Sequence, residues 1–239
     1  MPQHARNTGY NNTQKYFLVT DTLVALFWFF VLARLAILYP LTGSKFLAGG
    51  LADFYLGVLV ATETLELFNY VAVFRHIPGT QTAYNALPKP HPRVLLSVAG
   101  SRLVLAFVFF NYPRVARSEA FALVVLVQSV KEFFRWFYNL QKVRLYSNVP
   151  RLFRLCRSLT YLVCTPLEAV ATVYLVFQSL VFPSYQAELE PYDAQIKTFL
   201  KILLFAYLPT FYLIYKRTLS KYFFAQTSHR FSKPAEKLE

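Results

Sequence analysis

The chain has 239 residues, of which 56% are hydrophobic and 18% aromatic, and its mean hydropathy is positive at +0.36. Only 15% of the residues are charged, against about a quarter in soluble domains, so the composition excludes an ordinary soluble globular protein. The formal net charge is +13, but the basic residues lie mostly between apolar runs rather than on one clustered face. This distribution indicates a polytopic membrane protein and argues against nucleic-acid binding.

Six apolar runs are long enough to cross a membrane as helices, which requires about 20 residues each. They are residues 17–39, 51–74, 93–111, 119–141, 152–181 and 195–216. Pro, Gly and Asn separate the runs, and their continuous hydrophobicity differs from the alternation of β-barrel strands. The sequence therefore predicts an all-α fold. One six-helix transmembrane domain would occupy residues 17–217, between a polar tail (1–16) and a basic tail (218–239).

The distribution of Lys and Arg predicts the orientation of the bundle. An even number of spans places both tails on one side, and the tails and the connections 75–93 and 142–151 hold most of the bases. The opposite side has Lys45, Arg114, Arg117, Lys197 and Lys201, together with the acidic Glu188, Glu190 and Asp193. The positive-inside rule then places both tails inside, which means the cytosol for an endoplasmic-reticulum protein and the matrix for a mitochondrial inner-membrane protein. The first twenty residues contain no acid, which is compatible with mitochondrial targeting.

Cys and His residues do not form a pattern typical of metal or redox chemistry. Cys156 and Cys164 lie eight residues apart in one apolar run and are interpreted as unpaired thiols. His76 and His91 flank a Pro-rich connection without metal-ligand spacing. We therefore expect no metal and no cofactor.

Several charged residues fall within the predicted spans, where each costs at least ~2.5 kcal/mol unless it is paired or faces the bundle interior. Glu132 and Arg135, three residues apart, are expected to share a helix face, and Glu66 is expected within reach of Arg102. The charges are either struts between helices or the lining of a polar cavity that binds a ligand. The full set is Arg34, Glu63, Glu66, Arg102, Lys131, Glu132, Arg135, Arg157 and Glu168.

Four segments, in order along the chain, resemble motifs of the 3-hydroxyacyl-CoA dehydratases of very-long-chain fatty-acid elongation, also called protein-tyrosine-phosphatase-like A proteins. "LELFNYVAVFRHIPG" is similar to a Leu-Glu-x-x-His segment that runs into a Gly-Val-x-x-Ser turn, and "LLSVAGSRLVLAF" to Gln-x-x-Ser-Arg. "VKEFFRWFYNL" is similar to Glu-x-x-Arg-Tyr-x-Phe-Tyr. "VPRLFRLCRSLTYLVCTPLEAV" is similar to Leu-Arg-Tyr-Thr followed by Leu-Tyr-Pro-x-Gly-x-x-x-Glu. The resemblance covers roughly residues 16 to 180.

This resemblance implies a six-helix membrane bundle with both termini cytosolic. It also implies dehydration of 3-hydroxyacyl-CoA to trans-2-enoyl-CoA without a metal or redox cofactor. The family uses a Tyr directly before the motif Pro and a Glu seven residues after that Tyr. One group removes the proton α to the thioester and the other assists departure of the hydroxyl.

Both chemical positions are replaced in this chain. Arg157 precedes Pro166 by nine residues, as in the family, which sets Thr165 at the Tyr position and Thr172 at the Glu position. A Thr hydroxyl does not ionise near neutrality and is a poor general base. The polar positions that support the family's site match at Glu66, Arg102, Glu132, Arg135 and Arg157, whereas Val98 and Asn69 replace the motif Gln and His.

Tyr161 and Glu168 offer a displaced alternative. They are themselves seven residues apart and lie one helical turn before the family positions. A shift of one turn would disturb the catalytic geometry, and Arg157 would not move with the pair. We expect Glu168 instead to pair within the bundle, with Arg102 or Arg135.

The sequence thus leads to two hypotheses. The first is a catalytically degenerate dehydratase-like protein that serves as an accessory subunit of a membrane complex, surrounded by membrane lipids and with room for a bound acyl-CoA or phospholipid that is not turned over. The second is an active, divergent dehydratase that uses Tyr161 and Glu168. A transporter is disfavoured because no inverted repeat is apparent.

Overall fold

A computed structural model of the protein describes residues 12–44, 47, 49–74, 92–145, 149–182 and 191–231. Within these residues every regular element is helical, so the predicted all-α fold is confirmed. Predictions for Lys45, His76, His91, Glu188, Glu190 and the outermost parts of both tails lie outside the described residues.

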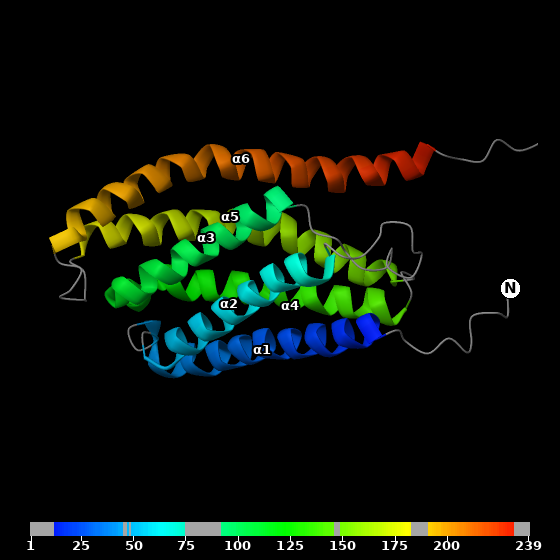
Figure 1. Ribbon diagram of the computed structural model, residues 1–239, viewed down its shortest axis with the longest axis horizontal. Helices are drawn as coiled ribbons and strands as arrows, with labels where there is room; N and C mark the ends of the chain where they lie inside the picture. The colour runs from blue at the N-terminus through cyan, green and yellow to red at the C-terminus, as the bar shows by residue number, and fades with distance from the viewer. Residues whose placement is uncertain are drawn as a thin grey trace, which may run out of the picture.

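Six long helices correspond one to one with the six predicted runs (Figure 1). They are α1 (Asn12–Thr42), α2 (Leu51–Phe68), α3 (Pro92–Asn111), α4 (Glu119–Arg144), α5 (Arg151–Val181) and α6 (Asp193–Phe231). A π-helix, η3 (Asn69–Phe74), continues α2, and a 3-10 turn, η4 (Pro113–Arg117), follows α3. α1 begins within the predicted polar tail and α6 continues into the predicted basic tail, because a helix need not end where its hydrophobic stretch ends.

Turn chemistry explains where the helices begin and end. Gly43 and Gly50 adopt positive φ angles of 71° and 56°, which only glycine accepts at little cost, and they bound the connection from α1 to α2. Pro113 begins η4 after α3 ends. The Ser118 hydroxyl caps α4 by accepting a hydrogen bond from the Phe121 amide at 3.4 Å.

Long apolar helices pack side by side, with α4 in contact with both α1 and α5, and α6 lying along α5 (Figure 1). Trp28 of α1, Tyr55 of α2, Phe121 of α4 and Leu175 of α5 are completely buried at the centre. The Tyr55 and Phe121 rings meet edge to face, with their centroids 6.0 Å apart. Successive helices run in alternating directions, so that the beginning of α1 and the end of α6 lie at the same end of the bundle (Figure 1).

Large apolar side chains also cover the outside of α1, α5 and α6; Phe205 on α6, for example, is 79% exposed. Among the residues that the structure describes, three helices are long and apolar enough to cross a membrane: α1, α5 and residues 193–213 of α6. The finding supports a membrane protein with at least three candidate spans. α2 and α4 are not among these three helices, because each carries three charged residues within its apolar stretch: Asp53, Glu63 and Glu66 in α2, and Lys131, Glu132 and Arg135 in α4. The described apolar part of α3, Ala99–Asn111, is shorter than a full span.

α5 continues through Pro166 without a break. Proline has no amide hydrogen, so the Leu162 carbonyl four residues earlier loses its usual helical partner. The Tyr215 hydroxyl of α6 donates a hydrogen bond to this carbonyl at 3.2 Å. The contact satisfies the freed acceptor and joins α6 to α5 at the level of the proline.

Candidate functional site

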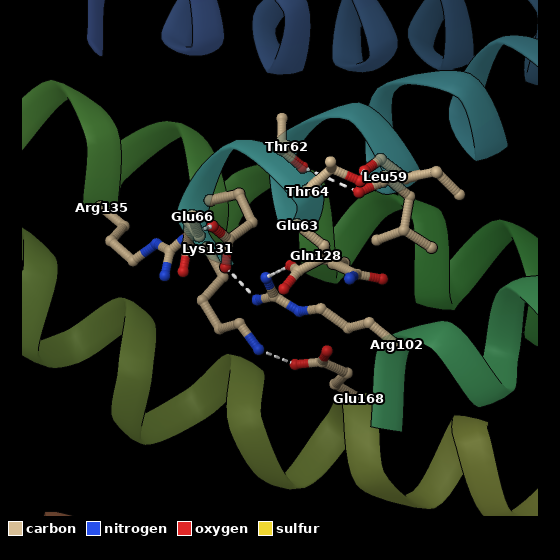
Figure 2. Close-up of polar contacts among 12 residues, drawn as sticks. Leu59, Thr62, Glu63, Thr64, Glu66, Arg102, Gln128, Lys131, Arg135 and Glu168 are labelled. Atoms are coloured by element: carbon tan, nitrogen blue, oxygen red, sulfur yellow. Dashed lines mark hydrogen bonds and ion pairs between the residues drawn. The ribbon is translucent and has the colours of Figure 1, made fainter. Parts of the chain in front are cut away.

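The polar centre of the bundle is an ion-pair network that spans α2, α3, α4 and α5 (Figure 2). Arg102 of α3 lies between Glu63 of α2 and Glu132 of α4 and donates a hydrogen bond to each carboxylate. Arg102 is 2% exposed, Glu63 1% and Glu132 0%. Charges so fully removed from solvent are tolerated only when each has a bonded partner of opposite sign.

Arg135 extends the network toward the end of the bundle where α1 begins. Its guanidinium donates to Glu66 of α2 and also pairs with Glu132 one turn earlier on α4. The predicted common face of Glu132 and Arg135 is therefore confirmed. The predicted contact between Glu66 and Arg102 is wrong, because Glu63 lies at the level of Arg102 and Glu66 lies one turn further along.

Lys131 connects the network to α5 by donating to the Glu168 carboxylate. We expected Glu168 to pair with Arg102 or Arg135, and this prediction is wrong as to the partner. Lys131 neighbours Glu132 on α4, and about 100° of helical rotation directs it toward α5 while Glu132 faces Arg102. Glu168 is consequently a neutralised strut between α4 and α5, with a side chain 12% exposed.

Arg157 was expected to belong to the same network, but it has no carboxylate partner among the described residues. Its guanidinium lies over the Tyr138 ring, 4.4 Å from the centroid, and 5.8 Å from that of Tyr161. Such contacts stabilise a cation by its attraction to the aromatic face. Arg157 is therefore held by α4 and α5 aromatics beside the network.

Thr172, which the resemblance aligns with the dehydratases' Glu, lines a cavity of about 290 Å³ between α3, α5 and α6. Tyr207 of α6 lies against the Thr172 hydroxyl, and Ser101 of α3 lines the same cavity. The remaining lining is apolar or carries hydroxyls and includes no Asp, Glu, Lys, Arg or His. Thr165, which the resemblance aligns with the dehydratases' Tyr, is half-buried and is not part of the lining. The described lining of the cavity thus offers hydrogen-bonding hydroxyls but no carboxylate or histidine to serve as a general base.

Tyr161 and Glu168 lie seven residues apart on α5, which corresponds to about 10 Å along the helix axis. Each is engaged separately, Tyr161 by Arg157 and Glu168 by Lys131. Neither lines the cavity beside Thr172. The two side chains therefore do not meet in the cavity beside Thr172.

Three features of the polar interior were missed by reasoning from the sequence. Asp21 of α1 is buried and interacts electrostatically with Arg135. Tyr55 donates a hydrogen bond to Gln128 beneath the ion pairs. Tyr16 donates to Asn69, where α2 turns into η3, at 2.8 Å. Asp21 could have been noticed as a lone acid in the first apolar run, whereas the other contacts depend on helix register.

At the opposite end of the bundle, the structure contains a separate polar contact. The Tyr112 hydroxyl donates to the Asp193 carboxylate at 2.9 Å and joins the end of α3 to the beginning of α6. Burial and this hydrogen bond raise the pKa of Tyr112 to about 12. Tyr112 therefore remains a neutral donor throughout the physiological range.

Cys156 and Cys164 are free thiols. Within the described residues, no cluster of three or more His, Cys, Asp or Glu side chains could hold a metal ion.

Comparison with known protein families, with curated proteins and with solved structures gives no match.

Proposed function

We propose that the chain is a catalytically degenerate, dehydratase-like membrane protein that serves as an accessory subunit of a membrane complex. The observation that carries this proposal is the loss of free proton-transfer groups. Thr occupies both positions that the resemblance assigns to the catalytic groups, and Glu168, the nearest carboxylate on α5, is neutralised by Lys131. What remains is an interhelical electrostatic framework that fixes the arrangement of α2 to α5.

All six long helices cross the membrane in this proposal. Five charges of α2 and α4 are paired with opposite charges inside the bundle, so a hydropathy count overstates the cost of inserting them: Glu63, Glu66, Lys131, Glu132 and Arg135. Residues 51–74 and 92–111 are also long enough, at about 36 Å and 30 Å of helix, to span a hydrocarbon core of about 30 Å. Both termini lie inside, in the cytosol or the mitochondrial matrix.

The proposed surroundings are membrane lipids and other subunits of a complex in the mitochondrial inner membrane or the endoplasmic reticulum. The basic composition and the acid-free beginning of the chain favour the mitochondrial inner membrane. The uncharged cavity beside Thr172 is compatible with the hydrocarbon of an acyl-CoA or phospholipid that is held without turnover.

The competing candidate is an active dehydratase that uses Tyr161 and Glu168. Their seven-residue spacing and their half-buried positions on α5 favour it. To act, Glu168 would have to separate from Lys131, and Tyr161 would have to reach the same substrate despite its contact with Arg157.

Turnover of a long-chain 3-hydroxyacyl-CoA by the purified protein distinguishes the two candidates. We expect no dehydration above the buffer rate, and the same result for Tyr161→Phe and Glu168→Gln. Measurable formation of the trans-2-enoyl thioester, abolished by either substitution, would establish the active enzyme and refute the degenerate one.

Purification from native membranes in a mild detergent tests the accessory role. We expect the chain to migrate with other polypeptides in a stoichiometric assembly. Recovery of the chain as a lone species under conditions that preserve known membrane complexes would contradict this role.

A further inference from the structure

The beginning of α5 carries three arginines, Arg151, Arg154 and Arg157, spaced by three residues. Arg151 and Arg154 are exposed, whereas Arg157 is half-buried one turn deeper along the helix. These residues form a basic ladder that leads from the end of the bundle toward its interior.

The positive charge of this ladder is not balanced by nearby acids. Within the described part of the chain, none of the three arginines pairs with a carboxylate. Arg154 donates to the Val149 carbonyl at 3.0 Å, and Arg157 is held by aromatic rings. Arg144, at the end of α4, and Lys15, near the beginning of α1, are also exposed at this end of the bundle (Figure 1). An anion is therefore the complementary partner.

A row of exposed leucines lies directly beside the ladder. Leu152, Leu155 and Leu159 are 65%, 50% and 51% exposed, and helical geometry sets them within about 100° of Arg151. Exposed Val163, Leu167 and Val170 continue the row along α5. A soluble anion would leave this apolar surface uncovered, whereas a phospholipid would cover it with an acyl chain.

We propose that the beginning of α5 is a binding site for an anionic phospholipid of the inner leaflet. Arg151 and Arg154 bind the phosphate, and the acyl chain lies along Leu152, Leu155 and Leu159. Arg157 adds a positive charge from within the bundle. The site is distinct from the cavity beside Thr172 and does not depend on whether the chain is a subunit or an enzyme, but its place in the inner leaflet rests on the proposed six-span orientation.

Lipid retention by the purified full-length chain tests the proposal. The chain in mild detergent is incubated with equal amounts of phosphatidylglycerol and phosphatidylcholine, and retained lipid is counted by native mass spectrometry. We expect preferential retention of phosphatidylglycerol. The double variant R151Q/R154Q should bind it roughly 30-fold more weakly, the effect of losing two basic residues near a membrane surface.

The matched control is R114Q/R117Q, which removes the same charge from exposed positions at the opposite end of the bundle. It should retain phosphatidylglycerol as the unmodified chain does. R151K/R154K keeps both charges and should retain most of the binding, which separates loss of charge from loss of folding.

Three results would overturn the proposal: equal losses in the α5 and control variants, equal retention of the two lipids, or failure of R151K/R154K to bind while its helix content is intact. Displacement of the lipid by inorganic phosphate beyond that caused by sodium chloride of equal ionic strength would assign the arginines to a soluble phosphate instead.

Discussion

Arg102 donates to both Glu63 and Glu132 in a region that is almost completely removed from solvent. The desolvation of these charges offsets much of their mutual attraction, so the network contributes more to the specificity of helix packing than to stability. Removing a single member of the network costs more stability, because a buried charge that remains then has neither water nor a partner.

Substitution Arg102→Leu should therefore destabilise the bundle by about 3–5 kcal/mol, since it leaves two carboxylates buried without their shared cation. The free energy of unfolding, measured for the purified protein in detergent or bicelles, checks this. Lys197→Gln is the control. It removes the pair with Asp193 at 2.8 Å, whose side chains are 24% and 21% exposed, and it should cost at most about 1 kcal/mol. Similar losses for both variants would contradict a special role for the buried cation.

The ion-pair network also shows which contacts of such a site a sequence can predict. The pairing of Glu132 with Arg135 follows from spacing within one helix, which the sequence determines. The partners of Glu66 and Glu168 depend on how far one helix is shifted and rotated against another. That shift is set by the packing of whole helices. Arg135 and Lys131 could therefore not be identified from the sequence as the partners of Glu66 and Glu168.

At the scale of elements, the continuity of apolar residues located all six long helices. Their ends were less predictable, because α1 and α6 continue beyond their hydrophobic stretches. The presence of Pro166 within an apolar run gave no indication of what compensates its missing hydrogen bond. The compensating group, Tyr215, lies 53 residues from Leu162 in the sequence and reaches it only after α6 packs along α5.

A double-mutant cycle between Pro166 and Tyr215 tests this compensation. In the natural background, Tyr215→Phe should cost about 1 kcal/mol, because the Leu162 carbonyl loses its donor. In a Pro166→Ala background, the restored amide of residue 166 bonds the carbonyl, and the same change should cost nearly nothing. The coupling of about 1 kcal/mol is read from unfolding free energies of the four proteins. Additive effects would mean that the two residues act independently.

At the scale of the whole molecule, charge is distributed unevenly between the two ends of the bundle. The end where α1 begins holds exposed Lys15, Arg144, Arg151 and Arg154. The other end has a mixture of bases and acids, including the Asp193 that pairs with Lys197. This asymmetry, together with the alternating helix directions, is the pattern that the proposed six-span orientation predicts. An arrangement in which only α1, α5 and α6 cross the membrane would not place these bases on one side.

Side-specific labelling of single cysteines decides between the two arrangements. With Cys156 and Cys164 replaced by Ala, Lys15→Cys, Arg114→Cys and Arg144→Cys each place one thiol at an exposed position. If α4 crosses the membrane, as its 26 residues or about 39 Å allow, a membrane-impermeant maleimide labels residues 15 and 144 from one side of sealed vesicles and residue 114 from the other. If only three helices cross, α2, α3 and α4 remain together on the far side, and residue 144 is labelled with residue 114 instead. The two arrangements place residue 144 on opposite sides of the membrane. Labelling of residue 144 from the same side as residue 114 would therefore refute the six-span bundle, even though all six helices are present.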